Sequence, residues 1–155
     1  MTALADRPLS HLLVAVDGSM GSARAARLAI ELSVDRPEAK ITFCHVLDVP
    51  LMVARATDRV DDYALAFRTA RDAARRMLEE YCLEAKEHGV NAQRCVRYGR
   101  PASEISTFAQ LIHADLVVIG NHHASALRRF FRGSTRDELM RSSPIPVLVA
   151  ERAVR

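Results

Sequence analysis

The sequence predicts an α/β protein with a single five-stranded parallel sheet and helices on both faces. Short apolar runs alternate with helical patterns along all 155 residues, in the order βαβαβαβαβ. The fourth run, Asp115–Ile119, is almost entirely aliphatic, as expected for a strand covered on both faces. No repeat, low-complexity tract or linker interrupts the alternation, so we expect residues 1–155 to form one domain.

The first half of the chain contains two predicted strands, at His11–Val16 and Lys40–Val46. Between them, apolar side chains at i, i+3, i+4 and i+7 indicate a helix, with Ser22 as its candidate N-cap. Its apolar positions are Ala25, Leu28, Ala29 and Leu32. A long helix is expected from about Val60 to His88, and Gly89 is its natural stop.

The second half contains the other three predicted strands, at Gln93–Tyr98, Asp115–Ile119 and Val147–Ala150. Pro101 stands where a helix is expected to begin, because proline suits the first turn of a helix. The apolar positions of that helix are Ile105, Phe108, Ala109 and Ile112. The run Pro144-Ile145-Pro146 separates the last helix from the fifth strand.

Composition narrows the classes of partner and location. Lys and Arg outnumber Asp and Glu by 22 to 19, a mild basic excess that does not indicate a nucleic-acid partner. No apolar run is long enough to cross a bilayer, and the N-terminus lacks a secretory pattern. Cys44, Cys82 and Cys95 are widely spaced and outside any CxxC pair, which favours reduced thiols and a cytoplasmic location.

Two strand ends are the predicted ligand-binding positions, because parallel sheets bind ligands beyond their carboxyl ends where strand order reverses. The first strand ends at Asp17-Gly18 and the fourth at Gly120. Gly120 and Gly133 bracket the loop before the last helix, which opens at Ser134-Thr135 with capping-box spacing. Free N–H groups at the start of that helix, together with its dipole, favour an anion such as phosphate.

Several chemistries find no support in the sequence. The P-loop pattern GxxxxGK[ST] is absent, and Asp17-Gly18-Ser19 lacks the Gly-x-Ser-x-Gly elbow of a nucleophilic serine. The six histidines form no ligand cluster, and the adjacent His122 and His123 are not spaced to share a metal. We therefore expect no catalytic residue and no metal site.

Four segments together resemble the universal stress protein family: LLVAVDGSMGSARAARLAIELS, ITFCHVLDVP, DLVVIGNHH and GSTRDELMRSSPIPVLV. Their order and spacing match the family over nearly the whole chain. The resemblance implies strand order 3-2-1-4-5 in an adenine nucleotide alpha hydrolase-like fold, usually a homodimer. One branch binds ATP through a motif of Gly, two residues, Gly, nine residues, Gly and Ser or Thr. This chain keeps that spacing from Gly120 to Gly133-Ser134, with His123 in place of the second glycine.

The resemblance assigns candidate nucleotide contacts to Asp17, Val46, Gly120, His123, Gly133, Ser134 and Thr135. Asp17 matches an acidic residue near the ribose and phosphates, where it would accept from a hydroxyl or help to hold Mg²⁺. Val46 matches a position whose backbone meets adenine. Gly120 and Gly133 match glycines that let backbone approach phosphate, and Ser134 matches a hydroxyl that donates to phosphate.

Each assignment has a structural alternative that the sequence leaves open. Asp17 also fits as the side chain that caps its own turn, and Gly120 as a residue that permits a tight strand exit. Ser134 is expected to cap the last helix in either case. Histidine tolerates positive φ better than most residues, so we expect the fold to accommodate His123. Its side chain either fills the space of the phosphates or donates a hydrogen bond to them.

Two functions therefore remain open. One is an ATP-binding regulatory module in the stress response that is not an enzyme, with at most slow hydrolysis of ATP. The other is a nucleotide-free homodimer that acts through protein–protein contacts. In both, we expect the edge strands Val147-Leu148-Val149 of two subunits to pair antiparallel about a two-fold axis. An adenylate-forming enzyme on a related fold is disfavoured because no acid, base or histidine signature marks it.

Overall fold

The computed structural model describes residues 8–55, 60–121 and 135–151. Within them, five parallel strands form one sheet in the order β3-β2-β1-β4-β5. The strands are β1 (His11–Ala15), β2 (Lys40–Asp48), β3 (Asn91–Gly99), β4 (Leu116–Gly120) and β5 (Val147–Ala150). The predicted fold class and strand order are confirmed.

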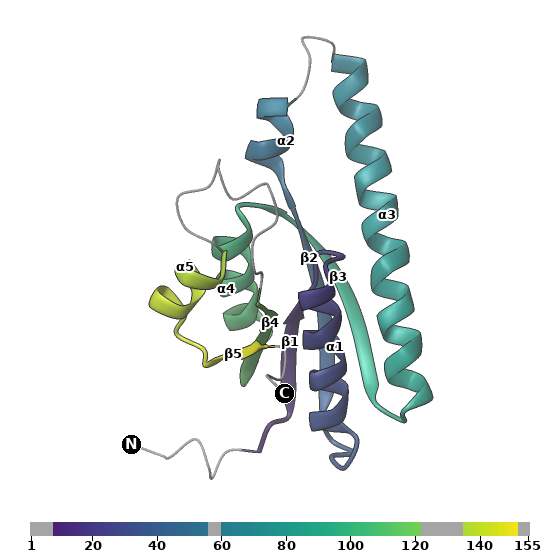
Figure 1. The fold of residues 1–155 in the computed structure, drawn as a ribbon, viewed down its shortest axis with the longest axis vertical. Coiled ribbons are helices and arrows are strands. Elements are labelled where there is room, and N and C mark those ends of the chain that lie inside the picture. Colours follow the sequence, from purple (N-terminus) through teal and green to yellow (C-terminus); the bar gives the residue numbers. More distant parts are fainter. Residues whose placement is uncertain (1–7, 56–59, 122–134, 152–155) are drawn as a thin grey trace.

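Helices cover both faces of this sheet (Figure 1). The helices α1 and α3 pack on one face, and α4 and α5 pack on the other. Their bounds, with those of the short α2, are α1 (Met20–Ser33), α2 (Val49–Arg55), α3 (Val60–Glu87), α4 (Pro101–Leu111) and α5 (Thr135–Ser142). Figure 1 also shows α2 and the first half of α3 extending beyond the carboxyl edge of the sheet.

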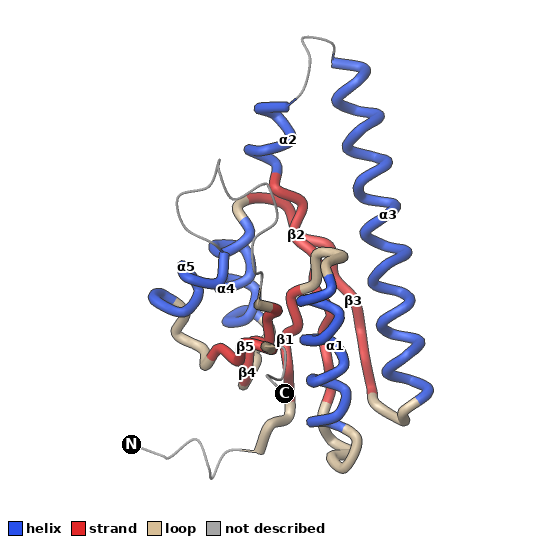
Figure 2. The backbone as a smooth tube through the Cα atoms, in the orientation of Figure 1, coloured by secondary structure: helices blue, strands red, loops and turns tan. Residues whose placement is uncertain are grey.

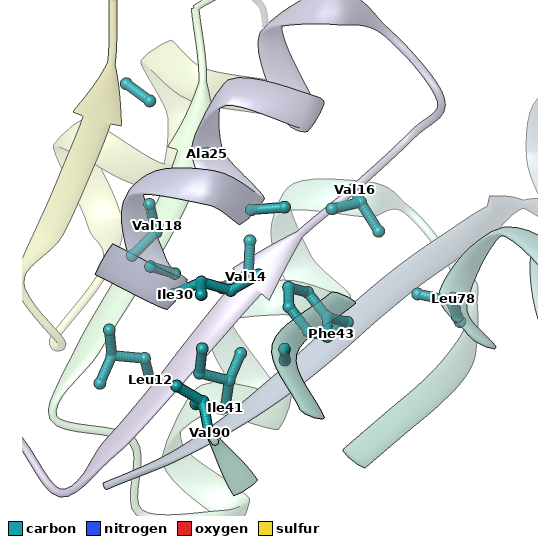
Figure 3. Close-up of a cluster of buried hydrophobic side chains, with 14 residues drawn as sticks. Leu12, Val14, Val16, Ala25, Ile30, Ile41, Phe43, Leu78, Val90 and Val118 are labelled. Carbon is teal, nitrogen blue, oxygen red and sulfur yellow. The ribbon is translucent and has the colours of Figure 1, made fainter. Parts of the chain in front are cut away.

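The core on the α1 and α3 face is built from alternate residues of the strands (Figure 3). Val14 and Phe43 of the sheet are fully buried beside Ala25 of α1 and Leu78 of α3. Small side chains on α1 let this helix lie close to β1 and β4. The apolar stripe predicted for α1 is confirmed, although Leu28 and Leu32 are only partly buried at its margin.

The opposite face has a second core beneath α4 and α5. Leu13, Val117 and Ile119 point from the strands toward Ile105 of α4 and Leu139 of α5. The central strands are therefore covered on both faces, which is why β4 contains almost only aliphatic residues.

The carboxyl edge is stepped, because β2 and β3 continue past the end of β1 (Figure 2). The last pair between β1 and β2 is Ala15 with Cys44, whereas β2 and β3 stay paired as far as Asp48 with Gly99. Strand order reverses between β1 and β4 at this edge. The step leaves the last residues of β2 beside the loop that follows β1.

A polar network around the buried side chains of His11 and Thr42 closes the amino edge of the same sheet. Nδ1 of His11 lies 3.0 Å from the Ile112 carbonyl oxygen, and its Nε2 lies 2.8 Å from the Thr42 hydroxyl. A carbonyl can only accept, so Nδ1 carries the proton and Nε2 accepts from Thr42. The Gln93 amide donates to the same hydroxyl at 2.8 Å. One oxygen of Asp115 accepts from the backbone N–H of His11 and from both donors of Ser10.

One local prediction was wrong, and one helix was missed. The N-cap of α1 is Ser19, whose hydroxyl accepts from the Ser22 N–H, and Ser22 itself lies inside the helix. The short α2 was not anticipated, although its start carries a signal. Asp48 accepts from the Leu51 N–H at 3.0 Å and Pro50 stands in the first turn, which is an ordinary capping arrangement.

Candidate functional site

Asp17 lies at the carboxyl end of β1 and forms a turn with the two residues after it. Its Oδ1 accepts from the Ser19 N–H at 3.0 Å, and Gly18 adopts a left-handed conformation with φ of +83°. The side chain of Asp17 nevertheless lies in an exposed position at the edge of the sheet. The turn-capping alternative for Asp17 is thus confirmed, and a ligand contact by the same carboxylate stays a prediction.

Ser22 holds this turn from inside α1. Its side chain is buried, accepts from the Asp17 N–H at 3.2 Å and donates to the Ser19 carbonyl at 3.0 Å. The Ser19 hydroxyl in turn accepts from the Ser22 N–H. The turn and the first turn of α1 are therefore joined by reciprocal hydrogen bonds, which fix the backbone that presents Asp17.

Val46 lies on the part of β2 that extends beyond β1. Its side chain packs against the core beneath α4, and its strand partner on β3 is Arg97. In a parallel strand the N–H and C=O of one residue face the same neighbour, and these directions alternate along the chain. Because the Cys44 carbonyl accepts from the Val16 N–H, the backbone groups of Val46 face the same side, past the end of β1.

Gly120 is required by the packing of the protein itself. A Cβ built on Gly120 would lie 2.2 Å from the carbonyl carbon of Gly21 and 2.5 Å from the Ser22 nitrogen. A Cβ on Gly21 would lie 2.9 Å from the Asn121 carbonyl oxygen. The end of β4 and the start of α1 therefore touch through backbone, which accounts for the glycine at 120 whether or not phosphate approaches it.

Asn121 joins three elements at this edge, and the sequence pattern did not single it out. It is buried, its N–H donates to the Ala150 carbonyl, and its amide donates to Glu151 at 2.8 Å. Its Oδ1 accepts from Arg136, the second residue of α5, at 2.7 Å. Arg136 also pairs with Asp137. A polar residue directly after an aliphatic strand was the signal that this position carries a specific contact.

The structure thus brings three of the predicted residues to one edge. Asp17, Val46 and Gly120 lie at the carboxyl ends of β1, β2 and β4, and Thr135 is the first residue of α5. The remaining three, His123, Gly133 and Ser134, lie outside the described residues, as does the predicted cap of α5.

Reactive thiols and metal ligands are not supported in the described part of the chain. Burial raises the pKa of Cys44 to about 12, and it also raises the pKa of Cys82 and of Cys95. Thiols with raised pKa are poor nucleophiles. Between residues 8 and 151, leaving out 56–59 and 122–134, no three His, Cys, Asp or Glu side chains are grouped to hold a metal. No helix in these ranges is long and apolar enough to cross a bilayer.

Comparison with known proteins identifies the family. The model of the universal stress protein family matches residues 8–151. The chain belongs to this family. A putative universal stress protein of Staphylococcus aureus strain USA300 is 30% identical over 142 residues, covering 90% of this chain and 82% of the relative. The resemblance noted in the sequence is therefore confirmed.

Solved universal stress proteins share the fold. One from Burkholderia pseudomallei has a TM-score of 0.74 at 26% identity, covering 91% of this chain and 95% of that one. A family member from Arabidopsis thaliana, solved with AMP bound, has a TM-score of 0.69 at 18% identity and covers 93% and 92%. Another, solved in complex with cAMP, has a TM-score of 0.63 at 24% identity and covers 91% and 95%.

Proposed function

We propose that this universal stress protein is an ATP-binding regulatory module with the nucleotide at the carboxyl edge of the sheet. The observation that carries the proposal is the continuous set of contacts across the point where strand order reverses. The Asp17 turn is bonded to α1, the start of α1 touches Gly120 and Asn121, and Asn121 is bonded to the first turn of α5. Ligands of parallel α/β sheets bind at such a point.

The residues at this edge suit the parts of an adenine nucleotide. The backbone N–H and C=O of Val46 match the hydrogen-bonding edge of adenine, and the exposed carboxylate of Asp17 suits a ribose hydroxyl or Mg²⁺. The N–H groups at the start of α5 suit phosphate. The structures with AMP and cAMP support an adenine nucleotide in general, and the motif spacing from Gly120 to Gly133-Ser134 favours ATP.

Calorimetric titration with Mg-ATP tests the proposal. We expect the wild type to bind and Gly133→Val to lose binding, because a branched side chain would fill the space assigned to phosphate. Ser134→Ala should weaken binding and also lower the free energy of unfolding by about 1 kcal/mol through the lost helix cap. Binding by Gly133→Val at wild-type affinity, with an unchanged melting curve, would remove the assigned phosphate site.

His123 decides how tightly this site binds. We expect it to donate to a phosphate oxygen, so that ATP affinity rises as the pH falls toward 6, near which a free histidine titrates. His123→Gly should flatten that pH dependence and leave binding at pH 8 equal or stronger. A wild type that binds nothing, with binding restored in His123→Gly, would instead favour the nucleotide-free homodimer.

A homodimer through β5 is part of the proposal. β5 is the last strand of the sheet on its side, and its residues Val147, Leu148 and Val149 are only half buried. Open strand edges are usually covered. The Val117 N–H of β4 donates to the Pro146 carbonyl, and the N–H of Asn121, directly after β4, donates to the Ala150 carbonyl. Leu148 therefore faces β4, whereas the backbones of Val147 and Val149 face outward.

This alternation gives a sharp test of the dimer. Val149→Pro removes one outward N–H and should yield a folded monomer, whereas Leu148→Pro breaks the ladder to β4 and should unfold the edge. Sedimentation velocity at micromolar concentration measures both. A wild type that sediments as a monomer would exclude this dimer.

A further inference from the structure

His45 lies between Val46 and the Asp17 turn, two parts of the proposed nucleotide site. It precedes Val46 on β2, and its Nδ1 lies 2.7 Å from the carbonyl oxygen of Val16, the residue before Asp17. The carbonyl can only accept, so Nδ1 carries the proton and donates. The imidazole of His45 therefore joins β2, whose Val46 backbone is assigned to adenine, with the turn that presents the Asp17 carboxylate.

The peptide unit between Val16 and Asp17 is held at both of its polar atoms. His45 donates to the Val16 carbonyl oxygen, and the buried hydroxyl of Ser22 accepts from the Asp17 N–H. A peptide unit is planar, so two fixed atoms leave it little freedom to rotate. The register of β1 with β2 ends at Ala15 and Cys44, and the last hydrogen bond between these strands is that of the Val16 N–H to the Cys44 carbonyl oxygen, so the turn begins directly after it.

We propose that His45 is a positioning residue of the nucleotide site, which sets where Asp17 is presented relative to the Val46 backbone. The inference rests on the proposed function, because it assigns Asp17 and Val46 to one nucleotide. It adds a residue that touches no nucleotide atom and acts only through the Val16 carbonyl.

Two amide replacements separate this role from simple packing. The side-chain nitrogen of Asn occupies nearly the place of imidazole Nδ1, whereas that of Gln lies nearer the place of Nε2. His45→Asn should therefore keep the bond to Val16 and hold the ATP dissociation constant within about threefold of the wild type. His45→Gln should lose the bond and weaken ATP binding by about tenfold.

His88 supplies a matched control. Its Nδ1 also lies close to a backbone carbonyl oxygen, that of Glu84, at 2.8 Å, but it follows the end of α3, beyond the amino edge of the sheet. His88→Gln removes the same kind of hydrogen bond and should leave the ATP dissociation constant unchanged.

A double-mutant cycle with Asp17→Asn decides whether His45 acts through Asp17. If it does, His45→Gln should weaken ATP binding by less than about twofold in the Asp17→Asn background, because that variant has no carboxylate whose position matters. An equal loss in both backgrounds would show a general structural role and overturn the inference. Wild-type affinity in His45→Gln would overturn it while the proposed function stands. A wild type and a His123→Gly variant that both bind no nucleotide would overturn both.

Discussion

The amino edge of the sheet and the Asp17 turn at its carboxyl edge use polar side chains in opposite ways. At the amino edge, His11 is 5% exposed and both of its ring nitrogens bond to groups of the chain. At the carboxyl edge, Asp17 is exposed, and the hydrogen bonds of Ser22 and His45 go to the backbone around it. At the amino edge, hydrogen bonds join side chains from separate strands, whereas those around Asp17 fix a turn that holds its acidic group at the surface.

This difference predicts how each end responds to substitution. Buried polar groups that satisfy one another are costly to disrupt, because each partner left behind stays desolvated. An exposed side chain on a fixed turn contributes little to folding, so that its removal is felt mainly by a ligand. Amino-edge changes should lower stability, and changes of exposed carboxyl-edge side chains should lower nucleotide affinity.

The largest effect on stability is expected at Gly120, which lies at the carboxyl edge but is required by the packing of α1 on β4. Gly120→Ala places a Cβ where backbone atoms of α1 lie 2.2 to 2.5 Å away, so α1 must shift from β4. We expect a loss of about 3 kcal/mol or more in the free energy of unfolding. Urea denaturation measures it.

Gly89 is the control for that substitution. Gly89→Ala meets no atom within 4 Å and suffers only from its φ of +73°, which costs about 1 kcal/mol. Equal losses at the two glycines would show that α1 and β4 do not meet through backbone as described, and would return Gly120 to the phosphate assignment alone.

The next largest effect is expected at His11. His11→Ala leaves the Ile112 carbonyl and the Thr42 hydroxyl each short of a partner, and should cost about 2 kcal/mol at pH 7.5. Gln93 still donates to Thr42 in the variant, which limits the loss. A loss below that of an exposed surface substitution would contradict the structural role of the amino edge.

The pH dependence of stability provides a second measurement on His11. Burial lowers the pKa of His11, and the charge of Lys40 acts in the same direction. As the pH falls through about 6.5, His11 binds a proton in the unfolded chain before it does in the folded chain. The contribution of His11 to the free energy of unfolding is therefore fully present above that pH and declines below it. Urea midpoints at pH 7.5 and 5.5 should differ less in His11→Ala than in the wild type; an unchanged difference would exclude His11 as a source.

The smallest effect on folding is expected at Asp17. Asp17→Asn keeps an oxygen that can accept from the Ser19 N–H, so the free energy of unfolding should change by less than about 0.5 kcal/mol. Binding of Mg-ATP should weaken by about fivefold, because a charged acceptor makes stronger hydrogen bonds than a neutral one. A large loss of stability with unchanged affinity would reverse the assignment of the two ends.

Sequence patterns alone predicted the parallel sheet and two of the residues at its carboxyl edge, Asp17 and Gly120. The alternation of strands and helices depends on local periodicity, which a chain displays wherever one face of an element is buried. The positions of Asp17 and Gly120 follow from the ends of strands, which were located within two residues, whereas Val46 was assigned by the family resemblance. The strand order followed from the family resemblance, which the comparison confirms.

Tertiary structure alone decided what these residues and their neighbours touch. His11 and His45 look alike in the sequence, each within an apolar run, yet one closes the amino edge and the other reaches the turn before Asp17. The need for glycine at 120 likewise arises from α1, which lies about a hundred residues earlier in the chain. Local periodicity indicates which face of a helix or strand is buried. A hydrogen bond or a backbone contact between distant segments depends on distances that exist only once the sheet has formed.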